Sequence, residues 1–235
     1  MTPYILPDPL AVPDAIRSLT GPLVWVVRDA DPLPTWAEHP NALTDAERQR
    51  ADRTRHPRAQ AQFLRGRTIL RAALGSVLRI APNTVPLVVT PDGKPVLDPQ
   101  AGLPALHFNV SHTDGAAVFA VSPVPVGVDV ERHRDGRDLL GLVSRFFATE
   151  EREQFIELPD ELRVSGFLRG WTCKEALLKG IGSGVRDLQN CAVELDPRCS
   201  PTVLRCPAGE HGWQLMCWQV SDEIAAAVAV QRAVV

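Results

Sequence analysis

The chain has 235 residues, 45% of them hydrophobic and 23% charged, which is the composition of an ordinary globular protein. A formal charge of −3 argues against a general nucleic-acid binder, although a local basic site for a phosphorylated small molecule stays open. No apolar run approaches about 18 residues, so we expect no transmembrane helix. The N-terminal segment contains acids and prolines without a basic start, and we expect no signal peptide.

The chain contains five cysteines, an odd number, and none of them form a C-x-x-C pair. This pattern speaks against a disulfide framework and against a structural zinc site. It indicates buried, reduced thiols of a cytoplasmic protein.

The predicted elements alternate in blocks of strands and helices. A short buried strand is expected at residues 22–27, and the capping-box spacing of Thr44 and Glu47 predicts an exposed helix through Arg55. Apolar residues at helical spacing from Ala59 onward predict a second, core-facing helix that ends at Pro82. Further strands are expected at residues 86–90, 107–111, 116–121, 126–131, 191–195, 213–220 and 224–230, and further helices at residues 139–147, 149–158 and 161–179.

This order of elements is typical of an α+β protein. The connections between the expected strands are short, which favours antiparallel pairing over parallel strands joined by crossover helices. A helix, a glycine turn and hairpin-like strands occur in each half of the chain. We therefore predict two similar halves, residues 1–124 and 125–235, each a small antiparallel sheet with a packed helix.

Two carboxylates lie two residues apart in the expected strand Gly127-Val-Asp-Val-Glu131. Because side chains alternate along a strand, Asp129 and Glu131 project from one face and repel each other unless a cation lies between them. Mg²⁺ favours such oxygen ligands, usually one or two carboxylates together with substrate phosphates. The alternative is a strand end whose acids are simply solvated.

A second group of charges belongs to the last expected helix of the central block. On that helix Trp171, Glu175 and Lys179 follow one another at i, i+4 spacing on one face. A surface ion pair would explain Glu175 and Lys179, but the apolar neighbours predict that this helix is largely buried. A buried carboxylate with lysines before and after it, Lys174 and Lys179, indicates a site that assembles a cation and phosphates.

Polar residues also stand where the strand at 107–111 ends. Ser111 and His112 are adjacent, so they point to opposite faces of a strand and do not form a hydrolase dyad, and no G-x-S-x-G elbow is present in the sequence. Asn109, Ser111 and His112 are better suited to donate hydrogen bonds to a phosphate. The alternative for a lone histidine is a structural role.

These segments, in this order, resemble the 4′-phosphopantetheinyl transferases of the larger, surfactin-type class. The length is similar to the two-half monomeric type of that family, not to the half-length trimeric type. The resemblance covers about residues 43 to 184 and is carried by Leu43-Thr-Asp-Ala-Glu-Arg48, Phe63-Leu-Arg-Gly-Arg67, Gly93-Lys-Pro95, Phe108-Asn-Val-Ser-His112, Gly127-Val-Asp-Val-Glu131, Phe146-Phe147 followed by Glu150, and Trp171-Thr-Cys-Lys-Glu-Ala176 with Lys179.

The resemblance implies an enzyme that moves the phosphopantetheine arm of coenzyme A to a serine of an acyl or peptidyl carrier protein, releasing adenosine 3′,5′-bisphosphate. The active site would lie at the interface of the halves, with nucleotide contacts from residues 1–124 and the metal strand and catalytic helix from residues 125–235. It implies a monomer, and neither a nucleic-acid nor a membrane partner.

The same resemblance implies individual roles. Asp129, Glu131 and Glu175 would hold Mg²⁺ against the coenzyme's pyrophosphate, and Glu175 would accept the proton of the attacking serine, directly or through water. Lys179 would neutralise or protonate the departing phosphate. Coenzyme A contacts are implied for Arg50, Arg65, Gly93, Lys94, Asn109, Ser111, His112, Lys174 and Lys179. Thr113-Asp114 departs from the serine-glycine that is commoner in the family after the histidine.

Other functions stay open beside this one. A coenzyme A-binding regulator without catalysis is disfavoured because all three acids and both lysines are retained. A Mg²⁺-dependent nucleotide phosphohydrolase would use the same metal with water as nucleophile. Mn²⁺ accepts the same oxygen ligands, so the choice of metal is not fixed by the sequence. The stretch 139–162, with Arg145 and Phe146, is the expected surface for an acidic carrier.

Overall fold

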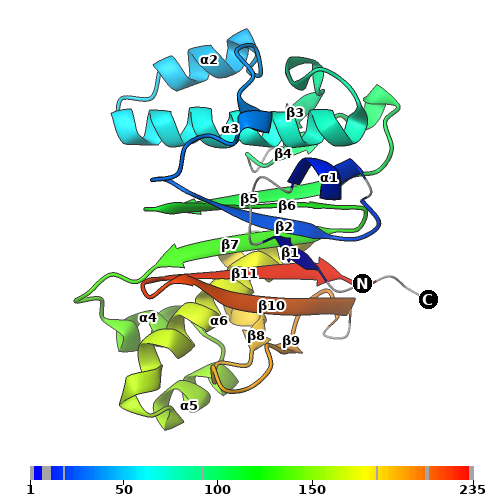
Figure 1. Ribbon diagram of the computed structural model, residues 1–235. Coiled ribbons are helices and arrows are strands. Elements are labelled where there is room, and N and C mark those ends of the chain that lie inside the picture. Colours follow the sequence, from blue (N-terminus) through cyan, green and yellow to red (C-terminus); the bar gives the residue numbers. More distant parts are fainter. Residues whose placement is uncertain are drawn as a thin grey trace.

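The protein forms successive layers of helix, sheet, sheet and helix (Figure 1). This computed structural model describes residues 3–6, 12–17, 19–90, 93–183, 185–209 and 212–232. Helix α3 (Pro57–Leu78) covers a four-stranded sheet, and helix α6 (Asp160–Ile181) covers a three-stranded one. Three apolar clusters fill the space between α3 and its sheet, between the two sheets, and between α6 and its sheet. The prediction of an α+β protein built from two similar halves is confirmed.

The four-stranded sheet has the order β1-β2-β6-β5. Its strands are β1 (Tyr4–Leu6), β2 (Leu23–Arg28), β5 (His107–Thr113) and β6 (Ala116–Ser122). The β2–β6 and β5–β6 pairs are antiparallel as predicted, whereas β1 pairs with β2 in parallel. Helix α1 (Val12–Arg17) lies between β1 and β2 in the chain and supplies the crossover that a parallel pair needs. The short strand β1 was missed because three residues between prolines carry no periodic signal.

Helices α2 (Asp45–Asp52) and α3 follow the predicted pattern at their starts, but both end earlier than predicted, and α2 ends at Asp52 and not at Arg55. The capping box of Thr44 and Glu47 is present. Helix α3 ends at Leu78, before Pro82, because Arg79 adopts a left-handed conformation with φ of 57°. The N–H of Ile80 then donates to the carbonyl of Gly75, where a Cβ atom would lie 2.8 Å from the Ile80 carbonyl oxygen. Pro82 instead begins a 3₁₀ turn, so its predicted role as the helix end is corrected.

The three-stranded sheet has the order β10-β11-β7 and is antiparallel throughout. It contains β7 (Val126–Arg132), β10 (Trp213–Ser221) and β11 (Ile224–Gln231). The smaller elements are α4 (Leu139–Phe146), α5 (Thr149–Glu157), the hairpins β3 (Leu87–Val89) with β4 (Pro95–Leu97) and β8 (Ala192–Val193) with β9 (Val203–Arg205), and the 3₁₀ helices η2 (Thr35–Ala37), η3 (Pro82–Thr84), η4 (Pro99–Ala101) and η5 (Val185–Asn190).

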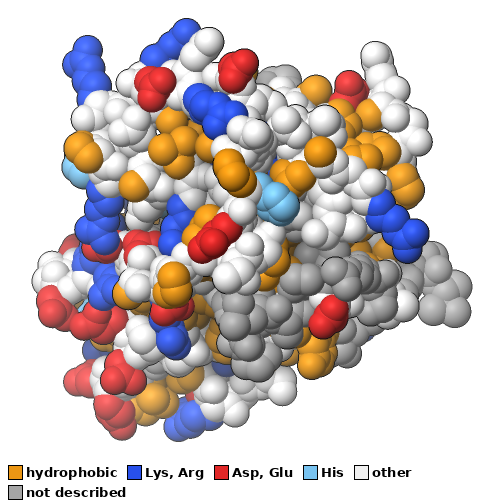
Figure 2. All heavy atoms as spheres, turned by 45° about the horizontal axis from the view of Figure 1, so that its top comes forward, with side chains coloured by type: hydrophobic (Ala, Val, Ile, Leu, Met, Phe, Trp, Pro, Cys, Tyr) orange, Lys and Arg blue, Asp and Glu red, His pale blue; other side chains and the backbone are white. Residues whose placement is uncertain are grey.

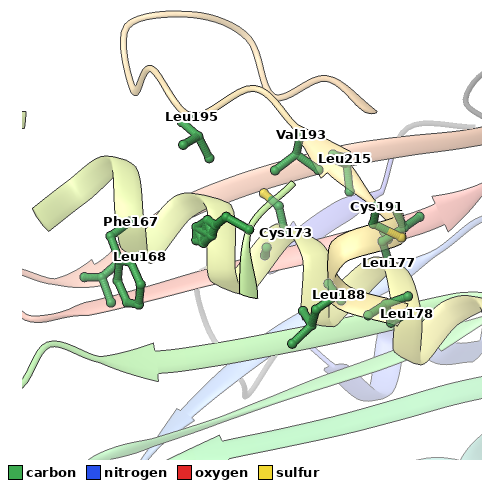
Figure 3. Packing of buried hydrophobic residues seen from close by; sticks show 14 of the residues in the cluster. Phe167, Leu168, Cys173, Leu177, Leu178, Leu188, Cys191, Val193, Leu195 and Leu215 are labelled. Carbon is green, nitrogen blue, oxygen red and sulfur yellow. The ribbon is translucent and has the colours of Figure 1, made fainter. Parts of the chain in front are cut away.

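The core around α6 is almost wholly apolar (Figure 3). Phe167, Leu168, Leu177 and Leu178 of α6 are buried in it, together with residues of the β8 and β10 segments. Within the described residues, no helix combines the length and the apolarity needed to cross a bilayer.

Candidate active site

Strand β7 and the C-terminal part of α6 approach each other closely enough to bring their polar side chains together. Val128 and Val130 pack between the two sheets, so Asp129 projects from the other face, toward α6. Gly127 allows this approach, since a Cβ atom there would lie 2.0 Å from the Ala176 carbonyl oxygen. A glycine at this position of β7 is therefore a geometric requirement of the site.

Asp129 lies at the centre of a polar cluster between the halves. Its Oδ1 accepts hydrogen bonds from Lys179 Nζ at 2.6 Å and from Ser111 Oγ at 2.9 Å. Lys179 Nζ also donates to Ser111 Oγ at 3.0 Å. The other carboxylate oxygen, Oδ2, is buried and finds no hydrogen-bond partner among the residues that the structure describes. An unpartnered buried anionic oxygen costs free energy unless a further positive group approaches it.

Glu131 and Glu175 complete an acidic group around Asp129. Burial, followed by the negative charge of Asp129, raises the pKa of Glu131 and that of Glu175. In each glutamate the ionised form is thus disfavoured by the negative charge of the neighbouring acids. No three His, Cys, Asp or Glu side chains in the described part of the chain already surround one point as metal ligands do. The donor chemistry fits a hard divalent cation, and the side chains would have to turn toward it.

A pocket of about 560 Å³ opens beside this cluster and is lined by both halves. The N-terminal half supplies α2, α3, the β3–β4 hairpin and β5, and the C-terminal half supplies the end of α6. Its charged or ionisable lining residues are Arg50, Arg67, Lys94, His112 and Lys179, and its apolar ones include Phe63, Leu70, Phe108, Val110 and Leu178. A basic rim over an apolar floor suits a phosphorylated ligand with a flat or apolar part.

The basic residues of the pocket are held by specific contacts. Arg50 and Arg67 both lie over the ring of Phe63, with their guanidinium carbons 5.0 Å and 5.6 Å from its centroid. Lys94 Nζ donates to the Lys179 carbonyl at 2.8 Å and so joins the β3–β4 hairpin to α6. Burial, followed by the charge of Lys179, lowers the pKa of Lys94, which means that a bound anion would relieve two crowded cations.

Comparison with known proteins agrees with this geometry. The model of the 4′-phosphopantetheinyl transferase superfamily matches residues 125–229, and that of the N-terminal part of 4′-phosphopantetheinyl transferases matches residues 31–124. The 4′-phosphopantetheinyl transferase HetI of Nostoc sp. is 37% identical over 189 residues, which cover 80% of this chain and 78% of the relative. The chain belongs to the 4′-phosphopantetheinyl transferase superfamily.

Relatives from distant organisms match shorter parts. A 4′-phosphopantetheinyl transferase of Bacillus subtilis is 29% identical over 61% of this chain and 62% of its own length. The human L-aminoadipate-semialdehyde dehydrogenase-phosphopantetheinyl transferase is 30% identical over 69% of this chain and 56% of its own length. The predicted membership of the superfamily, and with it the prediction of a phosphopantetheinyl-transferring enzyme, is confirmed.

Most of the predicted site residues of this phosphopantetheinyl transferase lie together. Arg50, Gly93, Lys94, Asn109 and His112 line the pocket together with Lys179. Ser111, on the opposite face of β5 from His112, bonds Asp129 and Lys179 instead. Asn109 Oδ1 accepts the N–H of Val128 at 3.1 Å, so this side chain also joins β5 to β7.

The structure does not bring Lys174 together with the other residues predicted to bind coenzyme A. Its side chain is 1% exposed and forms an ion pair with the fully buried Glu151 at 2.5 Å. Its Nζ also donates to the Phe146 carbonyl and lies over the ring of Phe147. On a helix Lys174 faces about 100° away from Glu175, and here that direction is the core between α5 and α6.

Arg65 is likewise not among the residues that line the pocket. Its guanidinium donates to the backbone carbonyls of Arg28, Asp31 and Pro32, which fixes the loop after β2. Arg67, which was not predicted to bind the nucleotide, lines the pocket instead. Glu47 holds Arg67 at 3.3 Å and Arg71 at 2.7 Å while it caps α2. Sequence reasoning assigned Glu47 to the cap alone and missed this second contact.

A second hollow of about 500 Å³ lies where α4 meets α6. Arg137 and Arg145 lie beside the apolar side chains of Leu142, Phe167 and Trp171 in it. Trp171 is one helical turn before Glu175, so this hollow borders the acidic group. On the face that α2 and α3 cover, basic side chains are interspersed with acidic and apolar ones (Figure 2), without the continuous basic stripe of a nucleic-acid surface.

Proposed function

We propose that this enzyme transfers the 4′-phosphopantetheine arm of coenzyme A to a serine hydroxyl of an acyl or peptidyl carrier protein, with Mg²⁺ or Mn²⁺ bound, and releases adenosine 3′,5′-bisphosphate. One observation carries the proposal: a basic pocket lined by both halves ends at Lys179, which is bonded to Asp129 beside Glu131 and Glu175. Because both halves of a single chain line the pocket, a monomer supplies all the groups that the reaction needs.

The first pocket would take the nucleotide of coenzyme A. Arg50 and Arg67 flank Phe63 and present charge-assisted donors for a phosphate, while the apolar floor suits the adenine ring. Lys94, whose Nζ donates to the Lys179 carbonyl, and His112 of β5 would take the pyrophosphate. Lys94 would exchange its bond to a helix-terminal carbonyl for a phosphate oxygen, which is the stronger acceptor.

Asp129, Glu131 and Glu175 would hold the divalent cation. The unpartnered Oδ2 of Asp129 and the raised pKa values of the two glutamates are the features of this structure that support the assignment. A bound cation supplies charge neutralisation and polarises the phosphoryl oxygens of the pyrophosphate.

The chain's own residues would divide the remaining work. The serine Oγ–P bond forms while the P–O bond of the pyrophosphate bridge breaks, and the electron pair of the broken bond leaves on adenosine 3′,5′-bisphosphate. Glu175, whose raised pKa makes it a stronger base, would take the serine proton directly or through water. Lys179 would neutralise the charge that grows on the leaving phosphate.

The carrier would dock at the second hollow. Its Arg137 and Arg145 suit an acidic partner, and Leu142, Phe167 and Trp171 suit an apolar contact. The hollow borders Glu175 through Trp171, so a serine presented there would lie near the acidic group.

The deciding experiment follows release of adenosine 3′,5′-bisphosphate from coenzyme A and Mg²⁺ with a carrier domain, without it, and with a carrier whose serine is changed to alanine. We expect release only with the intact carrier, together with a gain in carrier mass equal to one phosphopantetheine group. Release without the carrier would identify a phosphohydrolase. Coenzyme A binding without release under any condition would identify a non-catalytic binding protein.

A further inference from the structure

Two cysteines face each other at the open end of the β8–β9 hairpin. Cys191 directly precedes β8 and Cys206 directly follows β9. The strands are antiparallel, with Ala192 opposite Arg205. Continuing this register by one residue places Cys191 opposite Cys206. Directly opposed residues of antiparallel strands have Cα atoms about 4.5–5.5 Å apart. That spacing lies within the range of about 4.4–6.8 Å that a disulfide requires.

The side chains agree with this register. Cys191 is fully buried among the apolar residues that pack against α6 (Figure 3), and Cys206 is half-buried at the margin of the same cluster. The two thiols lie close enough for each to shift the pKa of the other, and both cysteines are free thiols. We propose that Cys191 and Cys206 are a reversible disulfide site, oxidised by a small disulfide and opened again by a small thiol.

The reaction balances with one oxidant molecule. The half-buried Cys206, as its thiolate, attacks one sulfur of oxidised glutathione, forms a mixed disulfide and expels one glutathione thiolate. Cys191 then attacks the Cys206 sulfur, gives its proton to solvent and expels the second glutathione. Two protein thiols are oxidised to one disulfide, and one glutathione disulfide is reduced to two thiols. Excess reduced glutathione drives the same steps backward.

Burial sets the rate of this exchange without preventing it. It raises the pKa of Cys191 to about 12 and raises the pKa of Cys206 as well. Thiolate is the reactive form, so few molecules carry it at neutral pH and the exchange accelerates as the pH rises. The cysteine pair is therefore suited to a disulfide that forms slowly and stabilises the fold, and not to rapid redox sensing.

The disulfide would close the β8–β9 hairpin. This hairpin is bonded to the buried polar residues of the C-terminal half. The Val193 N–H donates to Glu151 at 2.9 Å, and Glu151 holds Lys174 of α6. On the other strand, Arg205 forms an ion pair with Glu150 of α5 at 2.8 Å. Closing a loop of about 15 residues restricts the unfolded chain and stabilises the native one. The oxidised protein should therefore unfold at a higher temperature than the reduced protein.

The test treats the full chain with oxidised glutathione in mildly alkaline buffer and maps its peptides without reduction. Cys206→Ser removes the site, and Cys199→Ser is the matched control, because Cys199 is an exposed cysteine in the same segment. We expect a linked peptide containing Cys191 and Cys206 in the wild type and in Cys199→Ser. In both, the unfolding midpoint should rise by roughly 6–12 °C on oxidation and return on reduction, with no shift in Cys206→Ser.

Different products would overturn the proposal. Glutathione retained on Cys206 would show that Cys191 cannot reach it, and linkage of Cys199 to either residue would show a different pairing. An unreacted pair at a pH where other cysteines of the chain are oxidised would also exclude the site. Since serine is nearly isosteric with cysteine, Cys191→Ser provides a second variant if Cys206→Ser fails to fold, and it should likewise show neither link nor shift.

Discussion

Lys179 Nζ lies 2.6 Å from one carboxylate oxygen of Asp129, and the other oxygen, Oδ2, is buried with no hydrogen-bond partner in the described chain. The Lys179 ammonium group thus compensates only one oxygen of Asp129, and Glu131 and Glu175 add negative charge nearby. In the proposed metal site, Oδ2 would be the first ligand of the divalent ion, and Lys179 would stay bonded to Oδ1. This relationship makes Asp129 the residue on which the proposed metal site depends most.

Replacing Asp129 by asparagine should remove most of the transferase activity while the fold is kept. The amide has the same shape but lacks the charge that a divalent cation needs. A metal contributes several kcal/mol to the transition state, so we expect kcat to fall by about hundredfold or more. Carrier modification rates and a Mg²⁺ titration by calorimetry provide the measurement. Asp222→Asn, in the exposed turn between β10 and β11, is the control and should behave as the wild type. A folded Asp129→Asn protein with full activity at limiting Mg²⁺ would exclude the assignment.

Arg67 and Arg65 offer a matched pair for the nucleotide site. Both lie on α3, but Arg67 lines the pocket while Arg65 bonds backbone carbonyls after β2. Arg67→Ala should weaken coenzyme A binding by about 1.5–3 kcal/mol, or roughly ten- to a hundredfold, since one charge-assisted contact is lost. Arg65→Ala should leave the affinity of the folded protein within about twofold. Calorimetry with coenzyme A distinguishes the two, and equal losses in both variants would contradict the placement.

The difference between these two arginines shows what the sequence could decide. Phe63, Gly66, Arg67 and Leu70 stand at i, i+3, i+4 and i+7, the spacing of one helix face, and all four line the pocket. Arg65 lies on another face of the same helix. The helical spacing therefore identifies Arg67 as the arginine that shares a face with the other pocket residues. The resemblance to a family segment indicates that arginines are present there, but not which face of the helix each side chain occupies.

The direction of Asp129 was predictable for a similar reason, because alternation along a strand fixes which residues share a face. What the sequence could not supply was long-range pairing. Nothing near Lys174 indicates that Glu151, on another helix, lies at 2.5 Å from its ammonium group. The neighbouring Glu150, which was part of the matched segment, instead pairs with Arg205 at the surface. Glu150 is therefore at the surface and Glu151 is buried, and this difference depends on how α5 packs against α6.

The buried ion pair of Lys174 and Glu151 allows a prediction about stability that does not depend on the proposed transferase reaction. Burial raises the pKa of Glu151 and lowers the pKa of Lys174, so their attraction offsets only part of the cost of removing both charges from water. Lys174→Ala should destabilise the protein by about 3–5 kcal/mol because it leaves Glu151 uncompensated. The double variant Lys174→Met with Glu151→Leu should recover most of that loss. Urea unfolding measures both, and the double variant should bind coenzyme A like the wild type. A large loss of coenzyme A affinity in a stable double variant would return Lys174 to the binding site.

Cys217 should react with alkylating reagents near neutral pH, although its side chain is partly buried. A hydrogen bond from the Cys173 thiol lowers the pKa of Cys217 to about 7, so the thiolate is present above that pH and is lost below it. Its alkylation rate should therefore rise through about pH 7 and level off above it. Cys173→Ala removes the donor and should move the midpoint upward, toward that of an ordinary thiol. Peptide mapping of alkylated protein at a series of pH values measures the midpoint, and an unchanged value in Cys173→Ala would show that another group is responsible.

The carrier surface is tested by reversing one charge at the second hollow. Arg145 is exposed on α4, lies over the ring of Phe146 and faces the same hollow as Trp171. The proposed carrier is expected to be acidic around its modified serine, so Arg145→Glu should raise the KM for the carrier and leave coenzyme A affinity unchanged. Charges at the rim of an interface act mainly on the association rate, and the defect should shrink as the salt concentration rises. Arg232→Glu, an exposed arginine at the end of β11, is the control for the change in net charge. A carrier KM that responds neither to the reversal at Arg145 nor to salt would place the acceptor on another face of the molecule.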